Sequence, residues 1–406
     1  MYCPIKGFTL TKNQAVYRRE LAEKDTVVYF PRPEHVGNRI RFRDGAAFEV
    51  VAADQSAIPE IKYPFVYQNY HDPKLAELKE RLKLDEKLDS ALTGFERISA
   101  LYRISRFEIL DQMSAWPLPD FWDFVGYSIP NHNTHGACAE TSHRFVCIAS
   151  AYGYIARKVN FGRNDEDKSL PHVCTEIWCD ELQKWVFWDA LVPYYFEDIE
   201  TGIPLSLAEI VDRNLDERLD SVRIHSWREL RGDGMADKLV TVEYADRKGT
   251  SVENRWPDRF YWAAIYMGND HLSMSGLRFN HNVCLIMRPQ LDEDHWHEGG
   301  RYSRYYEHKC FQEVWDDHNL YMPQNQVEIN IADTPDGPVL ALAEFTPNFD
   351  HLEVRFDGGD WERRKALSPL RLADKTEIEA RTVNKAGMCG KPVRVTLART
   401  SAEGKS

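Results

Sequence analysis

The sequence predicts an α+β protein in which a mixed core is flanked by β-rich regions at both ends of the chain. Two observations support this class. Residues 73–112 carry apolar side chains at helical spacing, whereas short β-branched runs recur at nearly regular intervals after residue 325. The 406 residues are enough for roughly two to four domains of about 100–200 residues each. We expect four segments, at residues 1–94, 95–235, 236–324 and 325–400.

The composition argues against several classes of protein. With 11 Trp, 19 Tyr and 19 Phe, the chain carries far more buriable surface than a disordered protein. Its 51 basic and 64 acidic residues give a net charge of −13, which argues against nucleic acid and against an anionic membrane surface as partners. No run of the sequence approaches the roughly 20 apolar residues that span a bilayer. The composition thus leaves a globular protein whose expected partner is neither nucleic acid nor a membrane.

The ends and the cysteines of the chain indicate its compartment. No apolar stretch of a signal peptide follows Met1, so we expect a cytoplasmic protein, or a secreted one if the N-terminus has been trimmed. The eight cysteines are too sparse for a disulfide scaffold, and the spacing C-x-x-C is absent. An EF-hand loop is absent as well. We therefore expect no cofactor and no required metal, and the oligomeric state stays open.

The N-terminal part is expected to pass from strands to helices. Residues 26–30, 40–42 and 46–51 are β-rich and are separated by turn residues. Residues 73–112 then become helical and strongly charged. Residues 116–135, rich in Pro, Asn and aromatic side chains, are expected to be irregular. The apolar stripe of the helical stretch consists of Phe95, Ile98, Leu101, Tyr102, Ile104, Phe107 and Leu110.

A compact arrangement of a helix, a strand, a hairpin and a second helix is expected at about residues 136–230. Ser206 and Glu209 fit a capping box at the start of the second helix, in which each side chain bonds the backbone amide of the other residue. Residues 240–322 are expected to be mostly β, with a charged turn at 292–304. The strands expected after them, typical of a small β-sandwich, lie at 327–331, 339–343, 351–355, 378–381 and 393–397.

Cys138 is the first candidate catalytic residue. Phe145 and Ile148 mark the buried side of a helix that Gly153 can end, so Cys138 lies in its first turn. The N-terminus of a helix favours the thiolate form of a cysteine. Gly136 allows the backbone to approach a substrate closely, and the amide of Cys138 is a candidate oxyanion donor. The alternative is a small buried residue at the start of a helix.

His172 and Asp189 are the second and third candidates. Residues 172–179 and 183–189 are β-rich and are expected to form a hairpin. If this hairpin is centred between residues 180 and 181, the numbers of paired residues sum to 361, and His172 lies directly opposite Asp189. A slip of one residue would put the two side chains on opposite faces. The alternative is a half-buried polar pair without a chemical role.

The ordered set of motifs resembles the transglutaminase-like superfamily of papain-related cysteine enzymes over about residues 95–230. The motifs are G-x-C ahead of a helix, G-Y-I-A-R-K-V at 153–159, H-x-x-x-E-x-W from His172, and K-W-V-x-x-D ending at Asp189. Residues 202–210 resemble the segment that follows the aspartate in bacterial members. Thr346-Pro347-Asn348-Phe349 and residues 380–387 resemble parts of the Ig-like domain appended to some members.

The resemblance implies a papain-like core, in which the helix with the cysteine packs on an antiparallel sheet that carries the histidine and the aspartate. It assigns Cys138 as nucleophile, His172 as general base and acid, and Asp189 as the carboxylate that orients the histidine. Arg157 and Glu176 match recurring positions of the family and are expected to be structural, as is Gly136. The candidates for a second oxyanion donor are Asn131 and Asn133, or else these residues belong to a polar loop without that role.

The implied activity is acyl transfer on an amide of a protein or peptide through a thioester, with water as the acceptor, as in a protease or amidase. Two departures, Ala139 after the cysteine and Ala190 after the aspartate, leave the substrate class open. Two other functions stay open. One is a retired enzyme fold whose β-sandwich binds a protein or a carbohydrate. The other is a zinc site formed by His295, His297, His308 and Cys310.

Cys174 follows His172 by two residues and therefore lies on the same face of the strand. It is expected to be either a small buried residue or a partner for an inactivating disulfide with Cys138.

Overall fold

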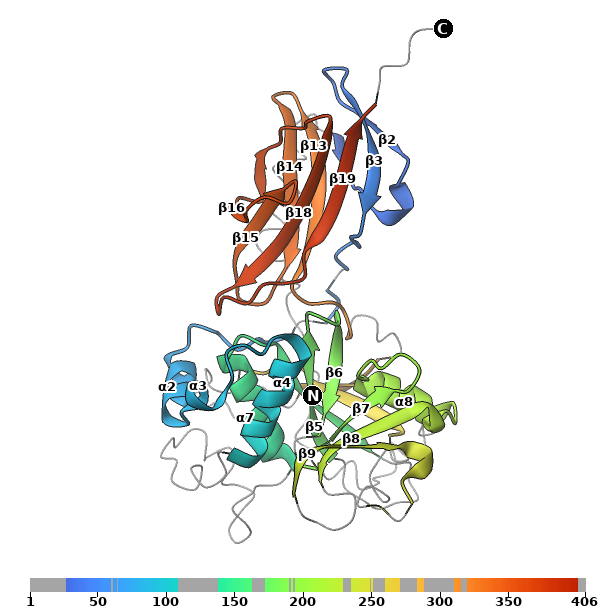
Figure 1. Cartoon of the computed structure of the whole chain (residues 1–406), viewed down its shortest axis with the longest axis vertical. Helices are drawn as coiled ribbons and strands as arrows, with labels where there is room; N and C mark the ends of the chain where they lie inside the picture. The colour runs from blue at the N-terminus through green and yellow to red at the C-terminus, as the bar shows by residue number, and fades with distance from the viewer. Residues whose placement is uncertain are drawn as a thin grey trace. The chain divides into compact units, whose positions relative to one another are not determined.

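The computed structural model describes residues 27–59, 61–63, 65–108, 138–162, 172–189, 191–192, 194–228, 235–248, 250, 260–270, 283–287, 310–314 and 320–400. The protein is a mixed α and β structure with more strand than helix and mainly antiparallel sheets, as the predicted α+β class requires. The chain forms two compact units (Figure 1). The first unit contains the described residues of Phe65–Tyr321, and the second contains those of 27–63 and 322–400.

A mixed sheet is the centre of the first unit. Among the described strands it has six members in the order β12-β11-β10-β4-β5-β6, and β11 with β12 is its parallel pair. A smaller antiparallel sheet has the order β7-β8-β9. The strands of the first sheet are β4 (Ala156–Gly162), β5 (His172–Cys179), β6 (Lys184–Trp188), β10 (Trp262–Tyr266), β11 (Val283–Met287) and β12 (Cys310–Val314). Those of the second are β7 (Tyr194–Asp198), β8 (Val222–Arg228) and β9 (Met235–Glu243).

Helix α7 (Cys138–Ala151) packs against β5 and β4. Apolar side chains such as Phe145 and Ile148 are fully buried along it. The Ser142 hydroxyl donates to the carbonyl of Val173 at 3.1 Å, which joins the first turns of α7 to β5. The helix ends before Gly153, whose φ of 81° places it in the left-handed region that favours glycine. This is the end that the sequence predicted.

The remaining helices follow local signals in the sequence. Asp72 caps α2 by accepting from the amide of Lys74, and Ser206 and Glu209 form the predicted capping box of α8. The predicted apolar stripe of residues 95–104 is buried at Ile98, Leu101 and Tyr102. The described elements are α2 (Pro73–Arg81), α3 (Leu84–Lys87), α4 (Gly94–Arg103), the π-helical turn η2 (Ile104–Glu108), α8 (Leu207–Leu215), and the 3-10 turns η1 (Pro33–His35), η3 (Leu219–Ser221) and η4 (Tyr244–Asp246).

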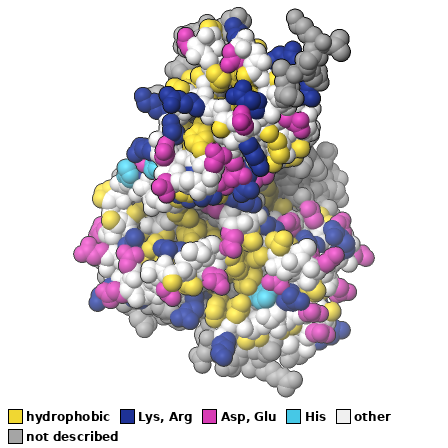
Figure 2. Space-filling model, turned by 45° about the horizontal axis from the view of Figure 1, so that its top comes forward, with side chains coloured by type: hydrophobic (Ala, Val, Ile, Leu, Met, Phe, Trp, Pro, Cys, Tyr) yellow, Lys and Arg dark blue, Asp and Glu magenta, His cyan; other side chains and the backbone are white. Residues whose placement is uncertain are grey.

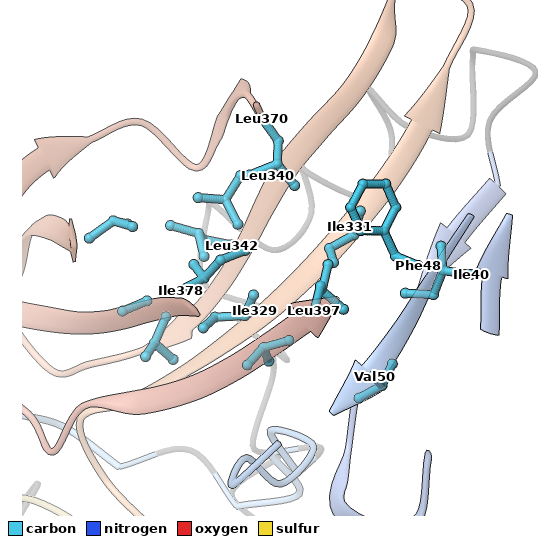
Figure 3. Close-up of a cluster of buried hydrophobic side chains, with 14 of the residues drawn as sticks. Ile40, Phe48, Val50, Ile329, Ile331, Leu340, Leu342, Leu370, Ile378 and Leu397 are labelled. Atoms are coloured by element: carbon cyan, nitrogen blue, oxygen red, sulfur yellow. The ribbon is translucent and has the colours of Figure 1, made fainter. Parts of the chain in front are cut away.

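The second unit is a sandwich of two sheets. In the described chain the sheets have the orders β1-β13-β14-β17 and β16-β15-β18-β19-β3-β2. Alternate residues of both sheets point inward and form one apolar core, with Ile329 and Leu340 from one sheet and Phe48, Ile378 and Leu397 from the other (Figure 3). The strands are β1 (Val27–Tyr29), β2 (Arg39–Arg41), β3 (Ala47–Ala53), β13 (Gln326–Thr334), β14 (Gly337–Phe345), β15 (Phe349–Phe356), β16 (Glu362–Arg364), β17 (Leu367–Pro369), β18 (Lys375–Asn384) and β19 (Val393–Arg399).

The units differ from the four predicted segments. The N-terminal strands, expected to belong to a segment 1–94, are part of the sandwich, because β1 pairs with β13 and β3 pairs with β19 (Figure 1). Residues 236–324, expected to be a separate extension, contribute β10, which pairs directly with β4 of the central sheet. In both cases pairing between distant strands buries backbone groups and apolar faces that a separate short segment would leave exposed.

The five strands predicted after residue 325 are all present, as parts of β13, β14, β15, β18 and β19. The irregular segment expected at 116–135 and the charged turn at 292–304 lie outside the described residues. None of the described helices is both long and apolar enough to cross a membrane. Acidic and basic side chains are interspersed over the face shown in Figure 2.

A partly buried ion pair between β7 and α8 makes part of the stability of the first unit dependent on pH. The hydrogen bond from Arg213, together with Thr201, lowers the pKa of Asp198 from its ordinary 3.8 to about 2. A carboxylate with a lowered pKa stabilises the folded state above its ordinary pKa, and this contribution is lost as the pH falls to the folded pKa.

We therefore expect Asp198→Asn to lower stability at neutral pH and to reduce the decline of the free energy of unfolding between about pH 4 and pH 2. Urea denaturation at several pH values measures this. Asp216→Asn is the control, because its pair with Arg218 is exposed, at 57% and 56% for the two side chains. An equal change of the pH profile in both variants would contradict the assignment.

Candidate active site

Cys138 is the first residue of α7, next to β5 and β10. Its side chain packs against a cluster formed by Val173, Trp262, Ala264 and Tyr266. It is nevertheless partly exposed, unlike the buried thiols of Cys147, Cys174 and Cys179. Among the cysteine side chains that the structure describes, the thiol of Cys138 thus combines a position at the start of a helix with access to solvent.

The β5–β6 hairpin has a register that differs from the predicted one. Thr175 pairs with Trp188 and Cys179 pairs with Lys184, so the numbers of paired residues sum to 363 and not to the predicted 361. The turn contains four residues, 180–183, and Gln183 has a φ of 52°. The predicted direct pairing of His172 with Asp189 is therefore wrong by two residues.

The two side chains still meet, because a shift of two residues keeps each side chain on its face of the sheet. His172 and Asp189 are diagonal neighbours, and such neighbours are within reach of long side chains. The Nε2 atom of His172 lies 2.7 Å from Oδ2 of Asp189. In this register it is Cys174 that corresponds to the position opposite Asp189.

Every polar atom of Asp189 takes part in a hydrogen bond. It is fully buried, and its Oδ1 accepts hydrogen bonds from the amides of Leu191 and Val192, both at 2.9 Å. The Tyr102 hydroxyl donates to its backbone carbonyl at 2.6 Å. Since Oδ1 is occupied by two donors, Oδ2 is left to bind the imidazole. The carboxylate therefore fixes the orientation of the His172 ring.

The ring of His172 is 7% exposed, and its edge contacts Phe161 at a centroid distance of 5.3 Å. An interaction with the side chain of Cys138 is among the effects that raise the pKa of this ring. Burial lowers the pKa of His172, but the Asp189 carboxylate, the thiols of Cys174 and Cys138 and the hydrogen bonds raise it well above the ordinary value. The site therefore favours an imidazolium beside the Cys138 sulfur.

No family model, no curated protein and no solved structure matches this chain. The interpretation of the site consequently depends on its geometry and on the chemistry of its side chains.

Cys174 lies on the same face of β5 as His172, as its spacing predicts. A histidine nitrogen, the Cys174 sulfur and an Asp189 oxygen all lie within 4.8 Å of one another. Burial and the neighbouring Asp189 raise the pKa of the Cys174 thiol, which is itself fully buried. Cys174 is thus a small buried residue, as one of the two expectations has it, and it is also free of any disulfide in this structure.

Two residues that support the site were not predicted from the sequence. Tyr102 was expected only as part of an apolar stripe, yet its hydroxyl bonds the backbone of Asp189, 87 positions away. Arg106, in the turn η2, donates from Nε to the carbonyl of Leu191 at 3.3 Å and interacts electrostatically with Asp189. The hydroxyl group of Tyr102, on an otherwise apolar stripe, is the sequence signal that could have identified this residue. No local sequence signal points to Arg106.

Arg157 and Glu176 form a buried ion pair between β4 and β5. They are cross-strand partners, and Nε and Nη2 of Arg157 donate to the same oxygen of Glu176 at 2.9 and 2.7 Å. The other oxygen of Glu176 accepts from the amide of Leu207, at the start of α8, and from the Tyr321 hydroxyl. The pair joins β4, β5 and α8, which agrees with the expected structural role.

The remaining predicted residues cannot be placed. Gly136, Asn131 and Asn133 lie outside the described residues, as do the histidines of the predicted zinc site, His295, His297 and His308. Cys310 is the first residue of β12, but its side chain is outside the description.

Proposed function

We propose that this chain is a transglutaminase-like cysteine enzyme that transfers an acyl group from a protein or peptide amide to water, as a protease or amidase. Its first unit would then be a papain-like core, and its second an Ig-like sandwich. The observation that carries the proposal is the order of contacts from the Cys138 thiol to the His172 ring and on to the buried Asp189 carboxylate. This arrangement of nucleophile, base and orienting group is the general form of an activated thiol.

In the first half of the reaction, transfer of the thiol proton to His172 gives a pair of thiolate and imidazolium, and the Cys138 sulfur attacks the carbonyl carbon of the amide. The tetrahedral oxyanion would accept a hydrogen bond from the amide of Cys138, the first described residue of α7. The C–N bond then breaks, the leaving amine takes the proton from the imidazolium, and a thioester remains. In the second half, His172 removes a proton from the water that attacks the thioester. The C–S bond breaks, the acid leaves, and the imidazolium returns the proton to the sulfur.

The Asp189 carboxylate supports both halves. Because it accepts from Nε2 of His172, the other ring nitrogen, Nδ1, is the one available to exchange a proton with the sulfur. The carboxylate also stabilises the imidazolium that forms in each half. Burial of the pair limits competition from water for these hydrogen bonds.

A retired enzyme fold that only binds a protein or a carbohydrate is the second candidate. The observation that favours it is the packing of Cys138 against the apolar cluster around Trp262, which restricts access to the sulfur. The two candidates differ in the reactivity of the thiol, because a site without turnover has no need of an activated sulfur.

We therefore expect iodoacetamide at neutral pH to modify Cys138 at least about tenfold faster than Cys389. Cys389 is the matched reference, because among the described cysteines it is the other one that is partly exposed. Mass spectrometry of peptides after short exposures measures both rates. The difference is expected to disappear in His172→Ala, which removes the base. Equal rates in the wild-type protein would favour the second candidate.

The substrate is to be found by trapping the acyl-enzyme. Incubation with a peptide library, rapid acid quenching and mass spectrometry should give an adduct on Cys138 whose mass identifies the acyl group. An adduct on any other residue, or one that persists in Cys138→Ala, would contradict the proposed reaction.

A further inference from the structure

The geometry points to a metal site: we propose that His172, Cys174 and Asp189 bind one divalent transition-metal ion, and that Zn²⁺ is the ion that their chemistry fits. A nitrogen, a sulfur and a carboxylate oxygen from these residues lie within 4.8 Å of one another. Histidine, cysteine and aspartate are the ligands of protein-bound zinc. Three such ligands leave one position open, as at zinc sites that bind water or a substrate.

The ligand atoms are close to the spacing that an ion requires. Zinc–ligand bonds of about 2.0–2.3 Å place tetrahedral ligands roughly 3.5 Å from one another. His172 Nε2 and Asp189 Oδ2 are 2.7 Å apart and would separate slightly. None of the three separations between ligand atoms exceeds 4.8 Å.

The scaffold holds the three ligands on one rigid face. His172 and Cys174 are alternate residues of β5, and Asp189 directly follows β6, its hydrogen-bonded neighbour. Asp189 Oδ1 is anchored by the amides of Leu191 and Val192, which leaves Oδ2 to bind an ion. Anchoring of this kind orients a metal ligand and increases the affinity of the site.

Burial and charge favour an ion over empty ligands. The three residues are at most 7% exposed. With the Cys174 thiolate, the Asp189 carboxylate and the neutral His172 imidazole as ligands, two negative charges would surround a divalent cation. The resulting site carries no net charge, which suits a buried position.

The ion would also act on the reaction, and this consequence rests on the proposed function. With a ring nitrogen of His172 bound to the metal, the imidazole could no longer take the proton of Cys138. Zinc would therefore inhibit the enzyme reversibly, and a chelator would restore the activity. Binding itself does not depend on the proposed function, because Cys138 is not one of the three ligands.

The test is a titration of the full-length, chelator-treated protein with Zn²⁺, followed by calorimetry. The wild-type protein is expected to bind one ion that Cys174→Ala and Cys174→Ser bind at least about tenfold more weakly. The matched control is Cys147→Ala, another buried free cysteine of the same unit, which should bind as the wild type does. Cys310→Ala tests the zinc site predicted at residues 295–310 and should also leave this ion bound.

Cobalt supplies a second readout that needs no change at Cys174. The wild-type protein with Co²⁺ should show a thiolate-to-cobalt charge-transfer absorption, and Cys138→Ala should keep it, because the thiolate ligand is Cys174. The inference is overturned if the wild type binds no zinc, if the Cys174 variants bind as tightly as the wild type, if only Cys310→Ala loses the ion, or if the absorption disappears in Cys138→Ala.

The outcomes also separate this inference from the proposed function. Zinc binding that depends on Cys174, found together with an unreactive Cys138, would retain the metal site and reject the enzyme. A reactive Cys138 without zinc binding would retain the enzyme and reject the metal site.

Discussion

Cys138→Ala and His172→Ala are each expected to reduce the rate of acyl transfer by about 10⁴–10⁶-fold, because nucleophile and base act as one unit. The rate is measured with the peptide identified by the trapped acyl-enzyme, and acylation itself by mass spectrometry. Cys147→Ala is the matched control, since it removes a buried thiol from the same helix. It should fold and retain most of the activity. Acyl transfer that survives in Cys138→Ala would exclude the proposed nucleophile.

Asp189→Asn is expected to be nearly as severe, with a loss of about 10⁴-fold. The reason is the pair of amides from Leu191 and Val192 that both donate to Oδ1. An asparagine must keep its carbonyl oxygen toward these donors, so its NH₂ group faces Nε2 of His172. The ring then carries its proton on Nδ1 and cannot accept the proton of Cys138. A variant with more than a tenth of the wild-type rate would contradict this account of the tautomer.

Arg157→Met is expected to cost about 3–5 kcal/mol of the free energy of unfolding, because it leaves the carboxylate of Glu176 buried without a countercharge. Glu176 is fully buried, and the guanidinium also stacks over the Trp185 ring at 3.9 Å. Urea denaturation measures the change. The combined variant Arg157→Met with Glu176→Gln should recover part of the loss, since no unpaired charge remains and the amide oxygen can still accept from Leu207.

The matched control for this experiment is Arg218→Met, which breaks an exposed ion pair with Asp216. Such pairs contribute about 0–1 kcal/mol. A loss of similar size in Arg157→Met would mean that the buried pair has no structural role, and the combined variant would then show no recovery.

The elements that local sequence signals could predict are those whose interactions are local. The capping box of Ser206 and Glu209 spans four residues, and Gly153 ends α7 by its own backbone preference. The strands after residue 325 follow from alternation and turn residues. The N-terminal strands were predicted as strands but not as part of the sandwich, because Val27 pairs with Asp333 and no local pattern records a partner so distant in sequence.

Some features of the candidate site could likewise be predicted from local sequence signals, and others could not. The types of residue, their order along the chain and the side of the strand that each occupies could be obtained from the sequence by itself, because side chains alternate with a period of two. The register of the hairpin could not, since it depends on the length and geometry of the turn at residues 180–183. Because the observed register differs from the predicted one by two residues, the contact between His172 and Asp189 is preserved. The same difference brings Cys174 opposite the carboxylate.

For this protein, the sequence determined the local elements and the identity of three side chains of the candidate site. Only the tertiary structure decided which backbone amides hold Asp189, how the Tyr102 hydroxyl reaches its carbonyl, and that Cys174 joins the cluster. The physical reason is range: capping, turns and alternation depend on neighbours a few residues apart, whereas the site forms where α4, α7 and β5 are packed together by apolar burial.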